Sequence, residues 1–84
     1  MESQKEMPSN MITVYVITVT ILKKKKYLKE YCTRSHDKKH IAQNANDEKE
    51  AIRFGSRQLA NEILKNILNP YNFHYQVEPL KIQG

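Results

Sequence analysis

The feature that most constrains this chain is its long uncharged stretch, Met11–Leu22, which reads MITVYVITVTIL. It holds no glycine or proline, and most of its residues are branched at Cβ, which stiffens χ1 and suits a pleated strand. Alternate residues form two rows that are both largely apolar, which predicts a central strand. A membrane-spanning helix needs about 20 apolar residues, and this stretch ends sooner, at Lys23–Lys26. We therefore expect a buried strand and no membrane segment.

The next segments predict further strands. Tyr27–Thr33 fits two interpretations, a second strand or an amphipathic helix, and we favour the strand because it would pair with the first. Lys23–Lys26 is a poor tight turn, since a two-residue hairpin turn favours Asn-Gly. Arg34–Lys39 is expected to be a loop, and His40–Gln43 a short third strand.

Two helix starts follow. Asp47 and Glu50 have the spacing of an approximate capping box, and Asn46 is an alternative cap. Either cap predicts a short helical turn that carries on to Phe54 before Gly55 breaks it. Ser56 is the predicted cap of the next helix. The apolar residues of that helix recur on one face at 3.6 residues per turn: Leu59, Ala60, Ile63, Leu64, Ile67 and Leu68. The pattern predicts a long amphipathic helix that ends before Pro70.

The last apolar pattern is strand-like. The apolar residues occupy odd positions up to Val77 and even positions from Leu80 on, which predicts a bulge at Glu78–Pro79. The proline favours an edge strand. The fold class is therefore α+β, a small antiparallel sheet in the order β-β-(β)-α-β with one long helix packed on one face. We expect residues 1–10 to be a disordered tail and residues 11–84 to form one domain.

Charge and cysteine content indicate the setting. The net charge is +5, and residues 23–43 hold eight basic residues against two acidic ones, so the excess lies in one stretch. The single cysteine, Cys32, excludes an intramolecular disulfide and favours a reducing compartment. The first ten residues show no signal-peptide pattern. We expect a cytoplasmic protein.

Residues 40–68, HIAQNANDEKEAIRFGSRQLANEILKNIL, resemble a stretch of small accessory proteins from phages and prophages of Gram-positive bacteria. The shared positions are Ala51, Phe54, Ser56, Ala60 and Ile63, and the preceding VYVITVTI is similar to their opening strand. The resemblance implies phage-type origin, a bacterial host and action by surface binding. Some such proteins inhibit host defence enzymes such as CRISPR effectors. The resemblance transfers no functional residue, and the run of four lysines departs from it.

The residues offer little for catalysis or metal binding. Cys32, His36 and His40 would share one face of a continuous helix, with His74 as a fourth zinc ligand, but the paired cysteines of structural zinc sites are missing. A half-buried cysteine and two loop histidines are the simpler interpretation. Cys32 beside His36 also lacks any sign of an oxyanion hole. We expect no enzyme, no metal and no cofactor.

The strongest chemical signal is the basic stretch with interleaved tyrosines. We expect it to bind a partner protein, as an inhibitor of a host defence or nucleic-acid-handling enzyme. The alternative is a nucleic-acid-binding accessory protein that holds phosphates by charge and stacks bases on tyrosine. A purely solvated hairpin end is a third interpretation. The chain is expected to be a monomer or homodimer. The candidate binding residues are Lys23, Lys24, Lys25, Lys26, Tyr27, Lys29, Tyr31, Arg34, Lys38 and Lys39.

Overall fold

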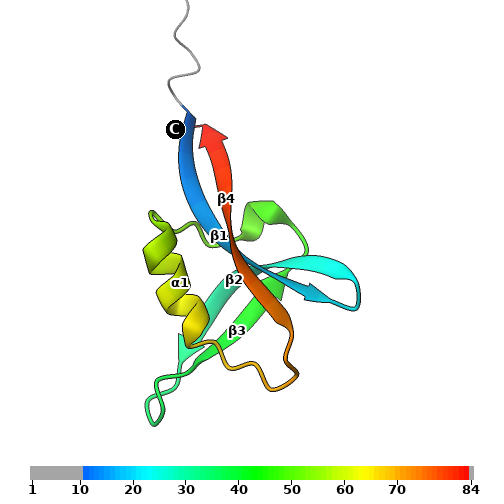
Figure 1. The fold of residues 1–84 in the computed structure, drawn as a ribbon, viewed down its shortest axis with the longest axis vertical. Coiled ribbons are helices and arrows are strands. Elements are labelled where there is room, and N and C mark those ends of the chain that lie inside the picture. The colour runs from blue at the N-terminus through cyan, green and yellow to red at the C-terminus, as the bar shows by residue number, and fades with distance from the viewer. Residues whose placement is uncertain (1–10, 84) are drawn as a thin grey trace, which may run out of the picture.

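The computed structural model describes residues 11–83, so the predicted tail at residues 1–10 lies outside the described part of the chain. The elements are β1 (Met11–Ile21), β2 (Lys24–Thr33), β3 (His40–Ala45), the 3-10 turn η3 (Glu48–Glu50), α1 (Arg57–Lys65) and β4 (His74–Gln83). The strands form one antiparallel sheet in the order β3-β2-β1-β4 (Figure 1). The α+β class is confirmed, and the predicted third strand and the strand interpretation of Tyr27–Thr33 are right.

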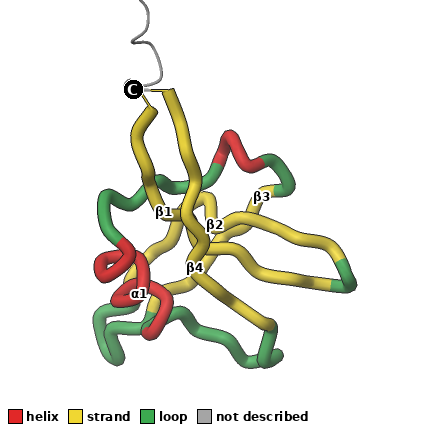
Figure 2. Tube along the Cα trace, turned by 45° about the horizontal axis from the view of Figure 1, so that its top comes forward, coloured by secondary structure: helices red, strands yellow, loops and turns green. Residues whose placement is uncertain are grey.

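β1 is the central strand that its composition predicts. It pairs with β4 along ten residues and with β2 only over Thr18–Ile21. Its middle residues, Val16 to Val19, are all buried. In Figures 1 and 2 the start of β1 and the end of β4 extend beyond the rest of the sheet as a two-stranded ribbon.

Past their short pairing, β1 and β2 diverge, and a later segment fills the gap between them. The N–H of Ile52 donates to the C=O of Leu28 at 2.9 Å, and Tyr15 and Phe54 exchange two backbone hydrogen bonds of 2.9 and 2.8 Å. The prediction that the helical turn carries on to Phe54 is therefore wrong. Only Glu48–Glu50 is helical, because the later backbone groups are used by the neighbouring strands.

The core lies between the sheet and α1. Its buried members come from five different segments of the chain: Ile17, Leu28, Phe54, Ala60 and Ile67. We call the sheet surface that carries Ile17 and Leu28 the helix face, and the opposite surface, which carries Thr18, the far face.

The long helix that the sequence predicts is wrong in its length. Ser56 is the cap, with its hydroxyl accepting from the N–H of Leu59 at 3.1 Å, but the helix ends at Lys65. The chain then runs beside β3. The N–H of His40 donates to Asn66 O, and the N–H of Leu68 donates to His40 O, both at 2.8 Å. These backbone bonds replace the last predicted helical turn, and from this extended segment Ile67 still reaches the core while Leu68 is exposed.

β4 has no bulge where the parity change predicts one. Its ten residues pair with β1 in one register, and the register shift of the sheet lies in β2, between Leu28 and Glu30. The apolar residues change face because α1 covers only part of the strand: Tyr75 and Val77 pack against the core on the helix face, whereas Leu80 has the opposite parity.

Pro79 nevertheless fits the predicted edge position. It lies opposite Tyr15, whose N–H and C=O are both bonded to Phe54 on the other side of β1. Because hydrogen-bonding direction alternates along a strand, the backbone nitrogen of Pro79 points to the open edge, where its missing N–H breaks no bond of the sheet.

Candidate functional site

The β1–β2 hairpin ends in a two-residue turn made by Leu22 and Lys23, with φ angles of 52° and 67°. Turns of this kind match the strand twist but require left-handed backbone, which costs roughly 1–2 kcal/mol for each residue other than glycine. The expectation of no tight turn at the lysines is thus corrected. We call residues 22–26 the hairpin tip; it lies at the right of Figure 1, at the cyan end of β2.

The lysines of the tip point to both faces of the hairpin. Lys24 lies opposite Ile21, and both therefore belong to the helix face, as Lys26 does. Lys25 lies opposite Thr20 on the far face, where Tyr27 is also placed. The tip therefore presents positive charge all round rather than as a one-sided patch.

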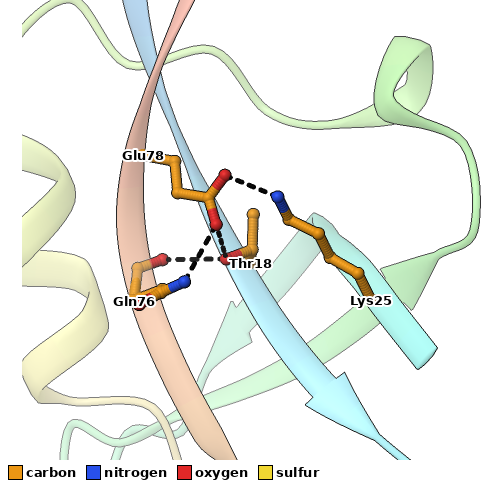
Figure 3. A network of polar contacts seen from close by, with 4 residues as sticks. All are labelled: Thr18, Lys25, Gln76 and Glu78. Atoms are coloured by element: carbon orange, nitrogen blue, oxygen red, sulfur yellow. Dashed lines mark hydrogen bonds and ion pairs between the residues drawn. The ribbon is translucent and has the colours of Figure 1, made fainter. Parts of the chain in front are cut away.

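A polar network on the far face holds the base of the tip (Figure 3). Lys25 Nζ lies 2.7 Å from Glu78 Oε1, and Glu78 Oε2 accepts from Thr18 Oγ1 at 2.9 Å and from Gln76 Nε2 at 3.0 Å. On the other face, Lys26 Nζ donates to Asn46 Oδ1 at 2.6 Å. The tip is therefore fastened to β4 on one side and to the segment after β3 on the other.

The network shifts the pKa values of its two charged members. Burial alone would raise the pKa of Glu78, but the hydrogen bonds from Lys25, Thr18 and Gln76 outweigh burial and hold that pKa below its ordinary 4.5. The hydrogen bond to Glu78 raises the pKa of Lys25 above its ordinary 10.5. Both groups are therefore charged near neutral pH.

Tyr27 and Tyr31, the tyrosines predicted beside the lysines, lie apart. Tyr27 is half-buried on the far face, with Lys25 Nζ 5.8 Å from its ring centroid. Tyr31 packs against the core, and its ring centroid is 4.7 Å from that of His40. Tyr31 therefore does not belong to the surface of the hairpin tip.

The remaining predicted residues lie farther along β2. Lys29 Nζ is 3.7 Å from Glu50 Oε1. Arg34, Lys38 and Lys39 belong to the β2–β3 loop, at the lower left of Figure 1, and the ten residues of β2 separate this loop from the tip by about 30 Å. The predicted basic stretch thus becomes two separate groups.

Within the β2–β3 loop an acidic residue offsets part of the charge. Arg34 forms a salt bridge with Asp37, and the N–H of Lys39 donates to Asp37 Oδ1 at 3.0 Å. The hydrogen bond from Arg34, followed by that from Lys39, lowers the pKa of Asp37 to about 2. The loop is largely closed on itself by these bonds.

The Cys-His spacing does not assemble a metal site in residues 11–83, where no three metal-ligating side chains come together. Cys32 is exposed on β2, and His40 is buried with Nδ1 2.9 Å from Thr33 Oγ1. A shared face would need a helix, whereas Cys32 and His40 lie on two strands joined by the loop that holds His36. The same described residues enclose no pocket, and none of their helices has the length and apolarity to cross a membrane.

The sequence pattern does not predict the parts of the site that depend on the pairing of the strands. Leu22 was assigned to the strand, although its position before the lysines is the turn itself. Glu78, Thr18 and Gln76 carry no local signal, because register alone brings them to Lys25. Comparison with known proteins gives no further guide, since no family model, curated protein or solved structure matches this chain.

Proposed function

We propose that this chain is a non-catalytic binding protein that occupies the surface of a partner protein, with the hairpin tip as the contact. One observation carries the proposal: four consecutive lysines gather at one hairpin end, and of these four only Lys25 forms a salt bridge with a carboxylate of residues 11–83. A cluster of this kind attracts an acidic surface and speeds association with it.

The placement of the tyrosines favours a protein over nucleic acid. Binding of single strands uses exposed aromatic rings on which successive bases stack. Tyr31 packs against His40 and the core, and Tyr27 is half-buried beside Lys25. The tip therefore offers charge without a stacking platform, which suits carboxylates better than bases.

We extend the proposal to a narrower role, that of a phage-type inhibitor acting in the cytoplasm of a bacterial host. Its support is the resemblance of residues 40–68 to small phage proteins. In this role the tip lysines compete for acidic groups of a nucleic-acid-handling defence enzyme.

The test compares the wild-type chain with two double variants that lose equal charge. Lys23 and Lys24 are changed to Gln in the tip variant, which spares the Lys25–Glu78 and Lys26–Asn46 bonds. The matched control changes Lys38 and Lys39 to Gln, in the β2–β3 loop at the other end of β2. Each chain is immobilised and exposed to a lysate of Gram-positive host cells, and captured proteins are identified.

We expect a protein that the wild type and the control capture and the tip variant does not, with capture weakening as salt rises. Equal capture by the tip variant, or no capture by the wild type, would refute the proposal. A gel shift with mixed-sequence DNA and RNA runs in parallel. A shift that the tip variant alone loses, at concentrations that capture no protein, would replace the proposal with nucleic-acid binding.

A further inference from the structure

Leu22 is exposed to an unusual degree for its type. Its relative exposure is 89%, higher than that of the other exposed large apolar residues among 11–83, such as Tyr71 at 77% and Leu59 at 51%. It stands at the apex of the hairpin, between Ile21 and the lysines. A lone exposed leucine is ordinary on a protein surface, so exposure by itself indicates nothing.

The backbone gives a second and independent observation. Leu22 and Lys23 both hold left-handed φ angles, which glycine or asparagine adopts at lower cost. Here the turn carries neither, so the hairpin keeps an apolar side chain at a position where both solvation and backbone geometry disfavour it. Residues held in such conformations are concentrated at sites that clamp ligands.

The third observation is that the tip is fastened in place. Lys25 is bonded to Glu78 on the far face, and Lys26 is bonded to Asn46 on the other. A backbone held in this way before binding loses less conformational freedom when it binds. The backbone of the tip is therefore constrained before binding, and the exposed side chain of Leu22 stands among lysines that point to both sides.

We propose that Leu22 is the anchor of the contact and enters an apolar pocket on the partner protein, and that the rim of this pocket carries carboxylates that face Lys23 and Lys24. The inference rests on the proposed function and adds the chemistry of the partner. Interaction hot spots lie near the centre of an interface, in well-packed and desolvated pockets inside a polar rim, which is the place that this arrangement gives to Leu22. The lysines set the rate of association, and Leu22 sets the rate of dissociation.

The test uses Leu22→Asn, because asparagine tolerates the left-handed backbone and the variant should fold at least as well as the wild type. Leu59→Asn is the matched control, an exposed leucine replaced in the same way on α1. The probe is the protein that the wild type captures in the lysate experiment. Dissociation is followed by biolayer interferometry, and folding by thermal melting.

We expect Leu22→Asn to dissociate at least about 30-fold faster than the wild type, with an unchanged or higher melting temperature, and Leu59→Asn to dissociate at the wild-type rate. If Leu22→Asn dissociates at the wild-type rate and the tip lysine variant fails to bind, the anchor is overturned and the proposed function stands. If the tip lysine variant still binds as the wild type does, the proposed function and the anchor are both refuted.

A vesicle-binding assay distinguishes a protein partner from a lipid surface. Wild-type chain is sedimented with phosphatidylglycerol vesicles and with phosphatidylcholine vesicles. Binding to the anionic vesicles that Leu22→Asn abolishes, at concentrations where no protein is captured, would overturn the pocket in favour of a lipid surface. No sedimentation with either vesicle agrees with a protein partner.

Discussion

The far-face network makes a testable contribution to stability through Glu78. In Glu78→Gln the ion pair is lost, the bond from Thr18 becomes a neutral one, and the Lys25 ammonium donates at best to an uncharged amide oxygen. Charged hydrogen bonds contribute about 1.5–3 kcal/mol and neutral ones about 0.5–1.5, whereas a partly exposed ion pair contributes under about 1 kcal/mol. With 27% of the Glu78 side chain exposed, we expect a loss of about 1–2 kcal/mol in the free energy of unfolding.

The pH dependence of that loss gives the sharper test. The pKa of Glu78 is lowered on folding, so its contribution is present above the unfolded value of about 4.5 and is lost as pH falls through the folded pKa. The pKa of Lys25 is raised, so its contribution persists below 10.5 and is lost only as pH rises through the folded pKa. The contribution of Glu78 to stability should therefore change only at acid pH, below about 4.5.

The measurement is urea unfolding of the wild type and Glu78→Gln at pH 7 and at steps below pH 4.5. We expect the difference in the free energy of unfolding between the two chains to be largest at pH 7 and to shrink as the pH falls below 4.5. Lys24→Gln is the control, because Lys24 lies on the other face and has no salt bridge within residues 11–83. A difference that is absent at pH 7, or that is equally large at low pH, would refute the assigned role of the network.

Three further predictions concern the core, the helix and the β2–β3 loop. Leu28→Ala removes a side chain with no exposed surface and should cost about 2–5 kcal/mol, seen as a lowered urea midpoint; a loss below 1 kcal/mol would contradict the core assignment. Ser56→Ala should cost about 1 kcal/mol by the same measurement, and an unchanged midpoint would contradict the cap. Arg34→Gln should move the NMR-titrated pKa of Asp37 from about 2 toward 3.8, and a static value would contradict the pairing.

The predictable parts of the fold were those that depend on local chemistry. Branched residues identified β1, and Ser56 identified the start of α1. The end of α1 was missed because the apolar pattern continues to Leu68, and nothing in that pattern reveals that residues 66–68 bond to β3 instead. Phe54 was assigned to a helical turn for the same reason, since its partner Tyr15 lies far away in the sequence.

The candidate site shows the same division. Lys23–Lys26 could be identified as a cluster because consecutive residues necessarily lie together. Arg34 and the loop lysines were wrongly grouped with them, because closeness in sequence becomes distance once a strand separates the two groups. Leu22 was missed because an apolar residue at the end of an apolar run predicts strand, and only the observed register makes it the turn.

The pairing of β1 with β4 has a consequence for the order in which a ribosome builds the molecule. β1 begins at Met11 and β4 only at His74, so the central strand is synthesised well before its longest partner. Until Gln83 has been added, one edge of β1 has no strand with which to pair. Completion of the sheet therefore waits for the last-made strand, and a nascent chain halted before it would expose an aggregation-prone edge.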